Sequence, residues 1–217
     1  MSGPPYSLFA THYSLLSLTT HHLTNMPLIL TSGPAVEPVT LAEAKAHLRV
    51  DGSAEDTLIA SLIVTSRLHV EAAAGLALVT QSWSWYVDAW PRGHALKLPL
   101  RPVQSIAAVR LYEETGAATT LDPATWFLDG AAAPPRLVRQ GALPWPRPSR
   151  IANGIEVAFT AGFGPASTDV PAPIRHAILL LIAHWHEHRS PLEDGAPAEF
   201  LPAMVSELLA QYKAVRL

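Results

Sequence analysis

The chain has 217 residues, of which 49% are hydrophobic and 15% charged, so we expect a folded globular protein of one domain, or of one domain with an insertion. It contains no cysteine, which excludes disulfides and cysteine-based metal or redox sites and fits synthesis in a reducing cytoplasm. The formal net charge of −3 argues against a protein that grips nucleic acid through a concentrated Lys/Arg surface.

Residues 1–37 are expected to form a flexible or arm-like N-terminal extension. Its first 25 residues are rich in Ser, Thr, Leu and His, and they lack the basic start of a secretory signal and any lipidation motif. Two interpretations of residues 1–25 stay open. They are either an extension upstream of a start at Met26, or an arm that becomes ordered on a neighbouring subunit.

Residues 38–77 are predicted to form a pair of helices. Thr40 and Glu43 have the spacing of a capping box, which starts a helix that runs to about Val50. A second helix starts near residues 53–56 and stops at Gly75, where glycine suits a helix C-terminus. Its apolar stripe is Leu58, Ile59, Leu62, Ile63, Val70 and Ala73.

Residues 78–165 are predicted to form an inserted β unit, because the hydrophobic period changes to two. Trp83, Trp85 and Val87 alternate with polar residues, so the two tryptophans share one strand face, which we expect to be core. Further short strands are expected near residues 96–100, 106–112, 126–128, 136–138 and 155–160, with a hairpin turn at 113–116. Several short strands with turns between them favour an antiparallel sandwich or barrel-like unit.

Residues 166–217 are predicted to contain two helices that pack on the helix pair of residues 38–77. Pro171 and Pro173 suit a first helical turn, and the apolar helix behind them is too short to span a bilayer. A second, short helix starts near Pro202. The predicted fold class is therefore α+β: a small helical bundle, with an N-terminal helix hairpin and two C-terminal helices, into which the β unit is inserted.

His184 and His188 are four residues apart on one helix face, as zinc-binding histidines often are. The sequence marks no third ligand, and Glu187 does not stand where a zincin motif needs it. The simpler interpretation is that these histidines, with Arg189, interact with the helix dipole or with a partner subunit. We therefore predict no metal and no cofactor.

Catalysis is not predicted. There is no Gly-x-Ser-x-Gly elbow, and the glycines at 162 and 164 lack the spacing of a phosphate-binding loop. Those glycines are better explained by a turn that needs a positive φ, with Phe163 packed behind it.

Two segments are candidate interfaces. Trp145 lies in a proline-rich loop expected to be extended, where fixed prolines reduce the entropy lost on docking; local packing is the alternative. The C-terminal end could dock into a groove or onto a sheet edge, with a frayed tail as the alternative. Its candidate contact residues are Tyr212, Lys213, Val215, Arg216 and Leu217.

An ordered set of short motifs carries a resemblance to a known family. After a hydrophobic strand come Ala161-Gly-Phe, Val170-Pro, a helix ending His184-Trp-x-x-x-Arg189, then Leu201-Pro and a Leu-Leu pair before Tyr212. This order resembles the head–tail connector (adaptor) proteins of long-tailed phages and phage-derived gene transfer agents. The likeness extends upstream through residues 38–50, so it covers roughly residues 26–217.

The resemblance implies a ring of identical subunits, a dodecamer, in the neck of a phage or gene transfer agent particle. Such a ring binds the portal protein through the C-terminal tail and presents its other side to a stopper or tail-completion protein. DNA passes through its lumen without sequence-specific binding, and no membrane takes part. The alternative is a carbohydrate- or protein-binding β module of a tail or baseplate component, which exposed, coplanar Trp83 and Trp85 would favour.

Overall fold

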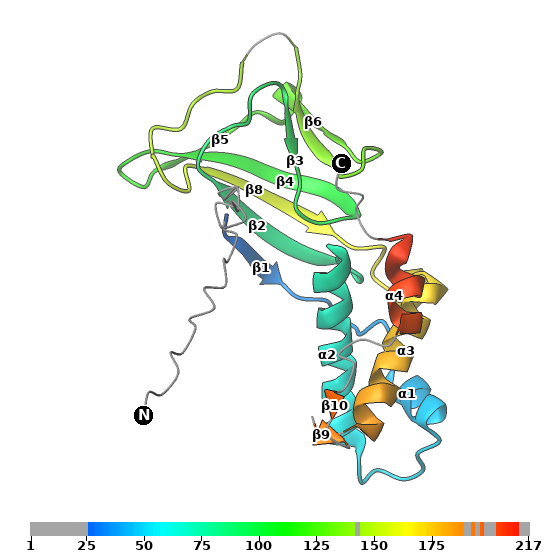
Figure 1. Cartoon of the computed structure of the whole chain (residues 1–217). Helices are drawn as coiled ribbons and strands as arrows, with labels where there is room; N and C mark the ends of the chain where they lie inside the picture. Colours follow the sequence, from blue (N-terminus) through cyan, green and yellow to red (C-terminus); the bar gives the residue numbers. More distant parts are fainter. Residues whose placement is uncertain (1–25, 142–143, 189–191, 194–195, 198–202, 213–217) are drawn as a thin grey trace, which may run out of the picture.

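The structure, a computed structural model, describes residues 26–141, 144–188, 192–193, 196–197 and 203–212 (Figure 1). Helices gather at one end together with the two-stranded sheet β10-β9 (Ala196–Pro197 and Leu192–Glu193), and the two larger β-sheets lie at the other. The helices are α1 (Leu41–Leu48), α2 (Asp56–Ala74), α3 (Ala172–Glu187) and α4 (Ala203–Ala210), with short 3₁₀ turns at Pro123–Thr125 and Ser167–Asp169. The strands are β1 (Leu28–Ser32), β2 (Gln81–Val87), β3 (Ala95–Lys97), β4 (Val103–Tyr112), β5 (Ala118–Thr120), β6 (Trp126–Asp129), β7 (Arg136–Arg139), β8 (Ile155–Ala161), β9 (Leu192–Glu193) and β10 (Ala196–Pro197).

α1 starts and α2 ends where their capping residues predict. The Thr40 hydroxyl accepts a hydrogen bond from the Glu43 amide, and the Glu43 carboxylate accepts one from the Thr40 amide, so the capping box is complete. α2 ends at Gly75, whose φ of 66° is the left-handed conformation that glycine adopts without strain. The buried stripe of α2 ends at Ala74, whereas the predicted Ala73 is exposed.

The four helices share one hydrophobic core. α2 contributes Ile59, Ile63 and Val70, and α3 supplies the largest share of the buried aliphatic side chains, among them Ile178 and Leu181. Val205 and Leu209 of α4 complete it. Pro173 lies in the first turn of α3, as its missing N–H allows. The structure therefore contains the helical bundle that was predicted as part of the α+β fold.

The β unit is an antiparallel sandwich, which confirms the predicted fold class. Five strands form one sheet in the order β1-β2-β8-β4-β5, and a second sheet has the order β3-β7-β6. Trp85 and Val157 of the larger sheet pack in one cluster with Leu96 and Leu137 of the smaller one. The hairpin turn expected at residues 113–116 joins β4 to β5.

Residues 28–32 depart from the prediction that residues 1–37 form a separate extension. They form β1, which pairs antiparallel with β2 along Leu28–Trp85 and Leu30–Trp83. The prediction was wrong here because a five-residue strand has too little periodicity to be recognised before its partner is known. Residues 1–25 lie outside the described part of the chain.

The bundle and the β unit are joined by a polar network around Glu71. Its carboxylate accepts from the Leu78 amide at 2.9 Å and from the Gln81 side chain at 2.5 Å, and it pairs with Arg67 at 2.8 Å. Arg67 also pairs with Glu37 at 2.7 Å. The network therefore connects the segment after β1, the last turns of α2 and the first residue of β2.

Candidate assembly surfaces

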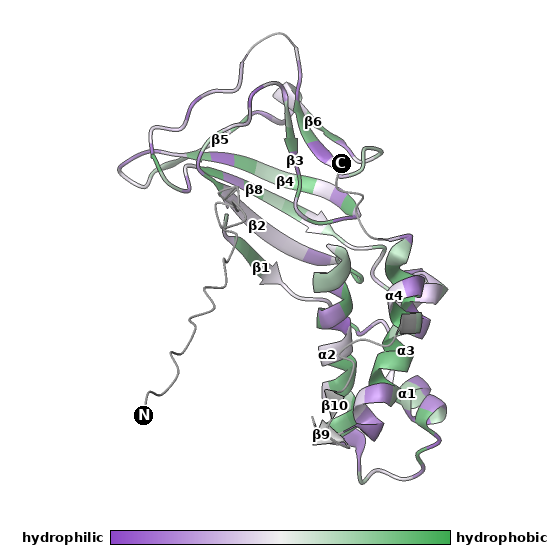
Figure 2. Ribbon diagram, in the orientation of Figure 1, coloured by the Kyte–Doolittle hydropathy of each residue, from purple (hydrophilic) through white to green (hydrophobic). Residues whose placement is uncertain are grey.

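The outward side of α2 carries no charged residue. Its exposed residues include Ala60, Val64 and Leu68 at a spacing of four, and Leu68 is 53% exposed. The full set, which we name the uncharged face of α2, is Thr57, Ala60, Ser61, Val64, Thr65, Leu68, Ala72 and Ala73. Figure 2 shows hydrophobic residues along much of this helix. Surface helices normally expose charged side chains, so this face fits a surface that another protein covers.

The charged residues of α2 turn away from this face. Arg67 and Glu71 are largely buried in the joint with the β unit. By length and composition, α2 is the one helix in the described part of the chain that could cross a bilayer. Core helices of soluble proteins pass the same test, and α2 packs against α3 in the shared core.

An apolar groove adjoins the uncharged face of α2. It has a volume of about 460 Å³, and Val36, Val39, Leu41, Ile63 and Val64 form its apolar lining. The segment after β1 thus lies along α2. In the described part of the chain, β1 is an edge strand that pairs with β2 alone and exposes Ile29 and Leu30. Helix face, groove and strand edge are three exposed apolar features of the N-terminal elements.

The C-terminal candidate residues are only partly described. Tyr212 packs against the helical core, and its carbonyl accepts a hydrogen bond from Arg101, which also donates to the Ala74 carbonyl at 3.3 Å. Arg101, Phe163 and Tyr212 line a pocket of about 240 Å³ between the bundle and the β unit. Tyr212 therefore secures the end of α4 to the β unit. Lys213, Val215, Arg216 and Leu217 lie outside the described residues.

The histidines at the end of α3 interact with one another. The rings of His184 and His188 lie 4.6 Å apart between centroids, and His188 Nδ1 is 2.9 Å from the His184 carbonyl oxygen. His186 Nε2 is 2.9 Å from the Glu55 carboxylate. Among the described residues, no three His, Asp or Glu side chains gather in a way that could hold a metal ion. Arg189, predicted to act with His184 and His188, lies outside the described residues.

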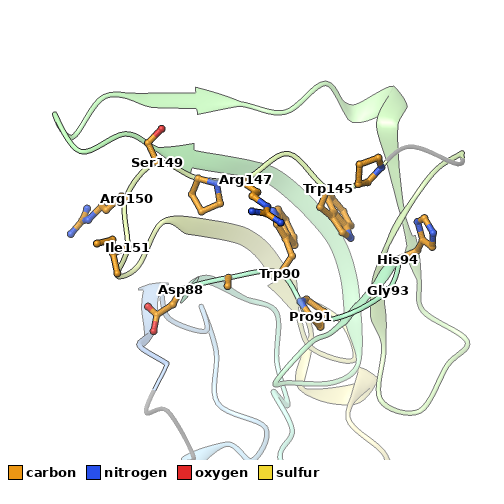
Figure 3. Close-up of a pocket in the computed structure, with 13 residues that line it drawn as sticks. Asp88, Trp90, Pro91, Gly93, His94, Trp145, Arg147, Ser149, Arg150 and Ile151 are labelled. Atoms are coloured by element: carbon orange, nitrogen blue, oxygen red, sulfur yellow. The ribbon is translucent and has the colours of Figure 1, made fainter.

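Trp145 is buried within the subunit. It is 7% exposed and stacks on Trp90, with the ring centroids 4.0 Å apart and the planes 9° apart. Trp90 donates to the Pro146 carbonyl at 2.8 Å, and the Arg139 guanidinium lies 5.5 Å from the Trp145 ring centroid. Local packing, the alternative interpretation of Trp145, describes its place in the subunit. Around the stacked pair lies an open pocket of about 650 Å³ (Figure 3), which we name the tip pocket.

Trp83 and Trp85 do not form an exposed platform. Trp85 is buried, and Trp83 is partly buried against the same sandwich cluster. The alternative of a carbohydrate-binding β module therefore loses the feature that would have favoured it. The turn at Gly162 is as predicted: its φ is 134°, and an added Cβ would lie 2.6 Å from the Thr80 amide nitrogen.

One buried carboxylate lies on the outer face of the large sheet. Glu156 accepts hydrogen bonds from Ser84 at 2.7 Å and Tyr112 at 2.8 Å, and Arg110 lies 3.1 Å from it. Burial alone would raise the pKa of Glu156, but these three partners lower it on balance. The same contact raises the pKa of Tyr112 to about 12. A carboxylate that is ionised and held by three partners is a structural group, since it is not poised to exchange a proton near neutral pH.

Replacing Glu156 with glutamine is expected to reduce the free energy of unfolding by about 2 kcal/mol at neutral pH, because two hydrogen bonds lose their charge and Arg110 loses its partner. A carboxyl whose pKa is lowered by folding stabilises the fold above its ordinary pKa and loses that effect as pH falls through the folded value. The difference between Glu156→Gln and the wild type should therefore shrink towards about pH 3.

Urea unfolding followed by tryptophan fluorescence at both pH values checks this prediction. The matched control is Glu113→Gln, because Glu113 is exposed and makes only backbone hydrogen bonds in the hairpin turn. An equal loss for Glu156→Gln at both pH values would contradict the ionic role.

Comparison with known proteins gives a consistent group of structural relatives. No protein-family model matches the chain, and no curated protein does. A chain in the neck of an empty gene transfer agent particle, computed with C6 symmetry, is 29% identical; the match covers 88% of this chain and 97% of that chain, with a TM-score of 0.76. A chain in the virion of the native gene transfer agent particle is 30% identical, with the same coverage and a TM-score of 0.75. A chain in the neck of the native particle, computed with C12 symmetry, is 30% identical over 87% of this chain and 97% of that chain, with a TM-score of 0.69.

Proposed function

Because the chain belongs to a family of neck proteins of gene transfer agent particles, we propose that it is the head–tail adaptor of a phage-like particle. In this role twelve copies form a ring beneath the portal, link the capsid to a stopper or tail-completion protein, and leave a lumen through which DNA passes. The observation that carries the proposal is the 30% identity to a chain in a neck computed with C12 symmetry. The match covers 97% of that neck chain. The role is mechanical and includes no catalytic step.

The uncharged face of α2 supports the ring. A closed ring needs two different surfaces on each subunit, one for each neighbour, because a contact repeated by rotation is heterologous. Val64, Leu68 and the adjoining groove form an exposed apolar surface that a neighbouring copy would remove from water. Helix-mediated contacts of this kind would strengthen by mass action once a portal gathers the subunits.

The chain after Tyr212 supports attachment to the portal. Arg101 holds the Tyr212 carbonyl, so the last five residues start from a fixed point between the bundle and the β unit. These residues combine two cations, Lys213 and Arg216, with the apolar Val215 and Leu217. A short segment of this composition can dock into a groove on a partner.

Deleting residues 213–217 is expected to leave the subunit folded and able to form rings, but to abolish attachment to the portal. The deletion has to start after Tyr212, because Tyr212 packs on the helical core and accepts from Arg101. Electron microscopy of particles made with the truncated protein should show packaged heads without tails. A shorter deletion, of Leu217 alone, removes one candidate contact residue and should lower the yield of tailed particles less than the five-residue deletion. Tailed particles in normal yield from the five-residue deletion would contradict the portal contact.

The adaptor role itself is tested by imaging the neck of a purified particle. We expect density for a ring of this subunit directly beneath the portal. Density for the subunit only in a baseplate or on the capsid surface would overturn the proposal.

A further inference from the structure

The tip pocket lies at the end of the β unit farthest from the helical bundle. β2 starts at the Glu71 joint and ends at Val87, and the pocket begins at the next residue, Asp88. Its other wall is the loop of residues 144–151, which precedes β8. The pocket is therefore well separated along the sheet from Tyr212 and the chain after it.

The walls of the tip pocket are held in place without any partner. Trp90 stacks on Trp145 and donates to the Pro146 carbonyl. Asp88 accepts from the Asn153 amide at 2.7 Å, which fixes the end of the second loop. Beside it, a Cβ at Gly154 would come within 2.5 Å of the Arg150 carbonyl oxygen, so this loop packs closely on its own base. Because the pocket is preformed, its residues lose little conformational entropy when a ligand binds.

The chemistry of the tip pocket is cationic and apolar. Arg147 and Arg150 line it and are exposed, and neither forms an ion pair with a described carboxylate. Asp88, the carboxylate in its lining, is already engaged by Asn153. Ile151 is 88% exposed, the largest exposure among the large hydrophobic side chains of the described residues. In Figure 3, Arg150 and Ile151 lie together at one end of the pocket, and Arg147 lies near Trp90.

We propose that the tip pocket binds an acidic segment of another protein, whose carboxylates pair with Arg147 and Arg150 while an apolar side chain packs on Ile151. Guanidinium groups bind carboxylates through paired, charge-assisted hydrogen bonds, so two exposed arginines without an ion-pair partner among the described residues suit such a ligand. The apolar contact with Ile151 makes the site selective for more than the charge of the ligand. The inference adds a second partner surface to the proposed adaptor role. It can fail while that role stands, because it is tested by binding to the isolated subunit.

A nucleic-acid ligand fits this surface less well. Duplex DNA needs a broad cationic face, whereas here two arginines share the pocket lining with an exposed isoleucine and several prolines.

The test measures binding of fluorescent probes to the full-length chain by anisotropy. The probes are a short peptide with glutamates on both sides of a central leucine, the same peptide with glutamine for each glutamate, and a short DNA duplex. We expect the acidic peptide to bind and the glutamine peptide and duplex not to compete with it. Arg147→Glu/Arg150→Glu should weaken peptide binding at least about tenfold. Ile151→Ser should weaken it about threefold.

A control variant carries the same change in charge away from the pocket. Arg49→Glu/Lys97→Glu reverses two exposed cations, at the C-cap of α1 and on β3, and should bind the peptide like the wild type. Because all the exchanged residues are exposed, thermal melts of both double variants should match the wild type. Equal losses in the two double variants, equal binding of the glutamine peptide, or displacement of the peptide by the duplex would each overturn the inference.

Discussion

Replacing Val64 and Leu68 with glutamate is expected to leave the subunit folded but unable to join a ring. Both side chains are exposed in the subunit, at 37% and 53%, so the substitutions should change its unfolding free energy by less than about 0.5 kcal/mol. In the proposed ring a neighbour covers them, and each subunit contact would bury two unpaired carboxylates. That costs about 3 kcal/mol or more per contact, a weakening of more than about a hundredfold.

Two measurements check this prediction. Negative-stain images of particles should show no tails when Val64→Glu/Leu68→Glu replaces the wild type, while light scattering should find a folded monomer. Because the chain has no cysteine, Leu68→Cys adds a single thiol, which should react with a maleimide in the free subunit and be protected in particles. Phe127→Glu is the matched control, since Phe127 is 48% exposed but lies on β6. Normal tailed particles from the double glutamate variant would exclude α2 from the ring contact.

Replacing Arg67 with methionine is expected to give the largest loss of stability of any single substitution considered, about 3 to 5 kcal/mol. Arg67 is buried and holds the carboxylates of Glu37 and Glu71 at 2.7 and 2.8 Å. Methionine fills much of the same space but leaves Glu71 charged in a largely buried site. The remaining partners of Glu71, the Leu78 amide and Gln81, are neutral donors and cannot replace the charge.

Urea unfolding followed by tryptophan fluorescence measures the effect. Arg67→Met/Glu71→Gln should recover part of the loss, because the second change removes the unpaired charge and keeps an acceptor for Leu78 and Gln81. Glu37→Gln is the milder control, since Glu37 is more exposed, and should lose about 1 kcal/mol. A loss under about 0.5 kcal/mol for Arg67→Met would show that the network does not hold the joint.

Local signals in the sequence predicted the helices and most strands well. The capping box at Thr40 and the stop at Gly75 are decided by residues within one turn. The sequence alone could therefore place the start of α1 and the end of α2. The tryptophan alternation in β2 likewise reports the core face of one strand. These features need no knowledge of distant partners.

Features that depend on distant pairs could not be predicted. For Trp145 an interface contact and local packing both stayed open, because its flanking prolines describe the loop but not Trp90, which stacks on it from another part of the chain. β1 needed β2 as a partner before its five residues became a strand. The tip pocket also depends on two loops far apart in sequence.

Two signals were present in the sequence but were not used. Residues 57–66 contain no charged side chain at all, which is unusual for a helix with a solvent-facing side and already indicates the uncharged face of α2. Arg67 falls on the apolar stripe one turn after Ile63 and one turn before Glu71. A charged residue on a buried stripe requires a partner, and Glu71 stands at the spacing to supply it.

The Glu71 carboxylate couples the helical bundle to the β unit, so that the two parts of the subunit move together. It ties the final turns of a helix to the opening residue of a strand, so a swing of the two ends about the connection at residues 75–80 would break these contacts. While they hold, a tilt imposed on one end turns the other end with it. In the proposed adaptor ring, each subunit would therefore pass mechanical load from the capsid side to the tail side.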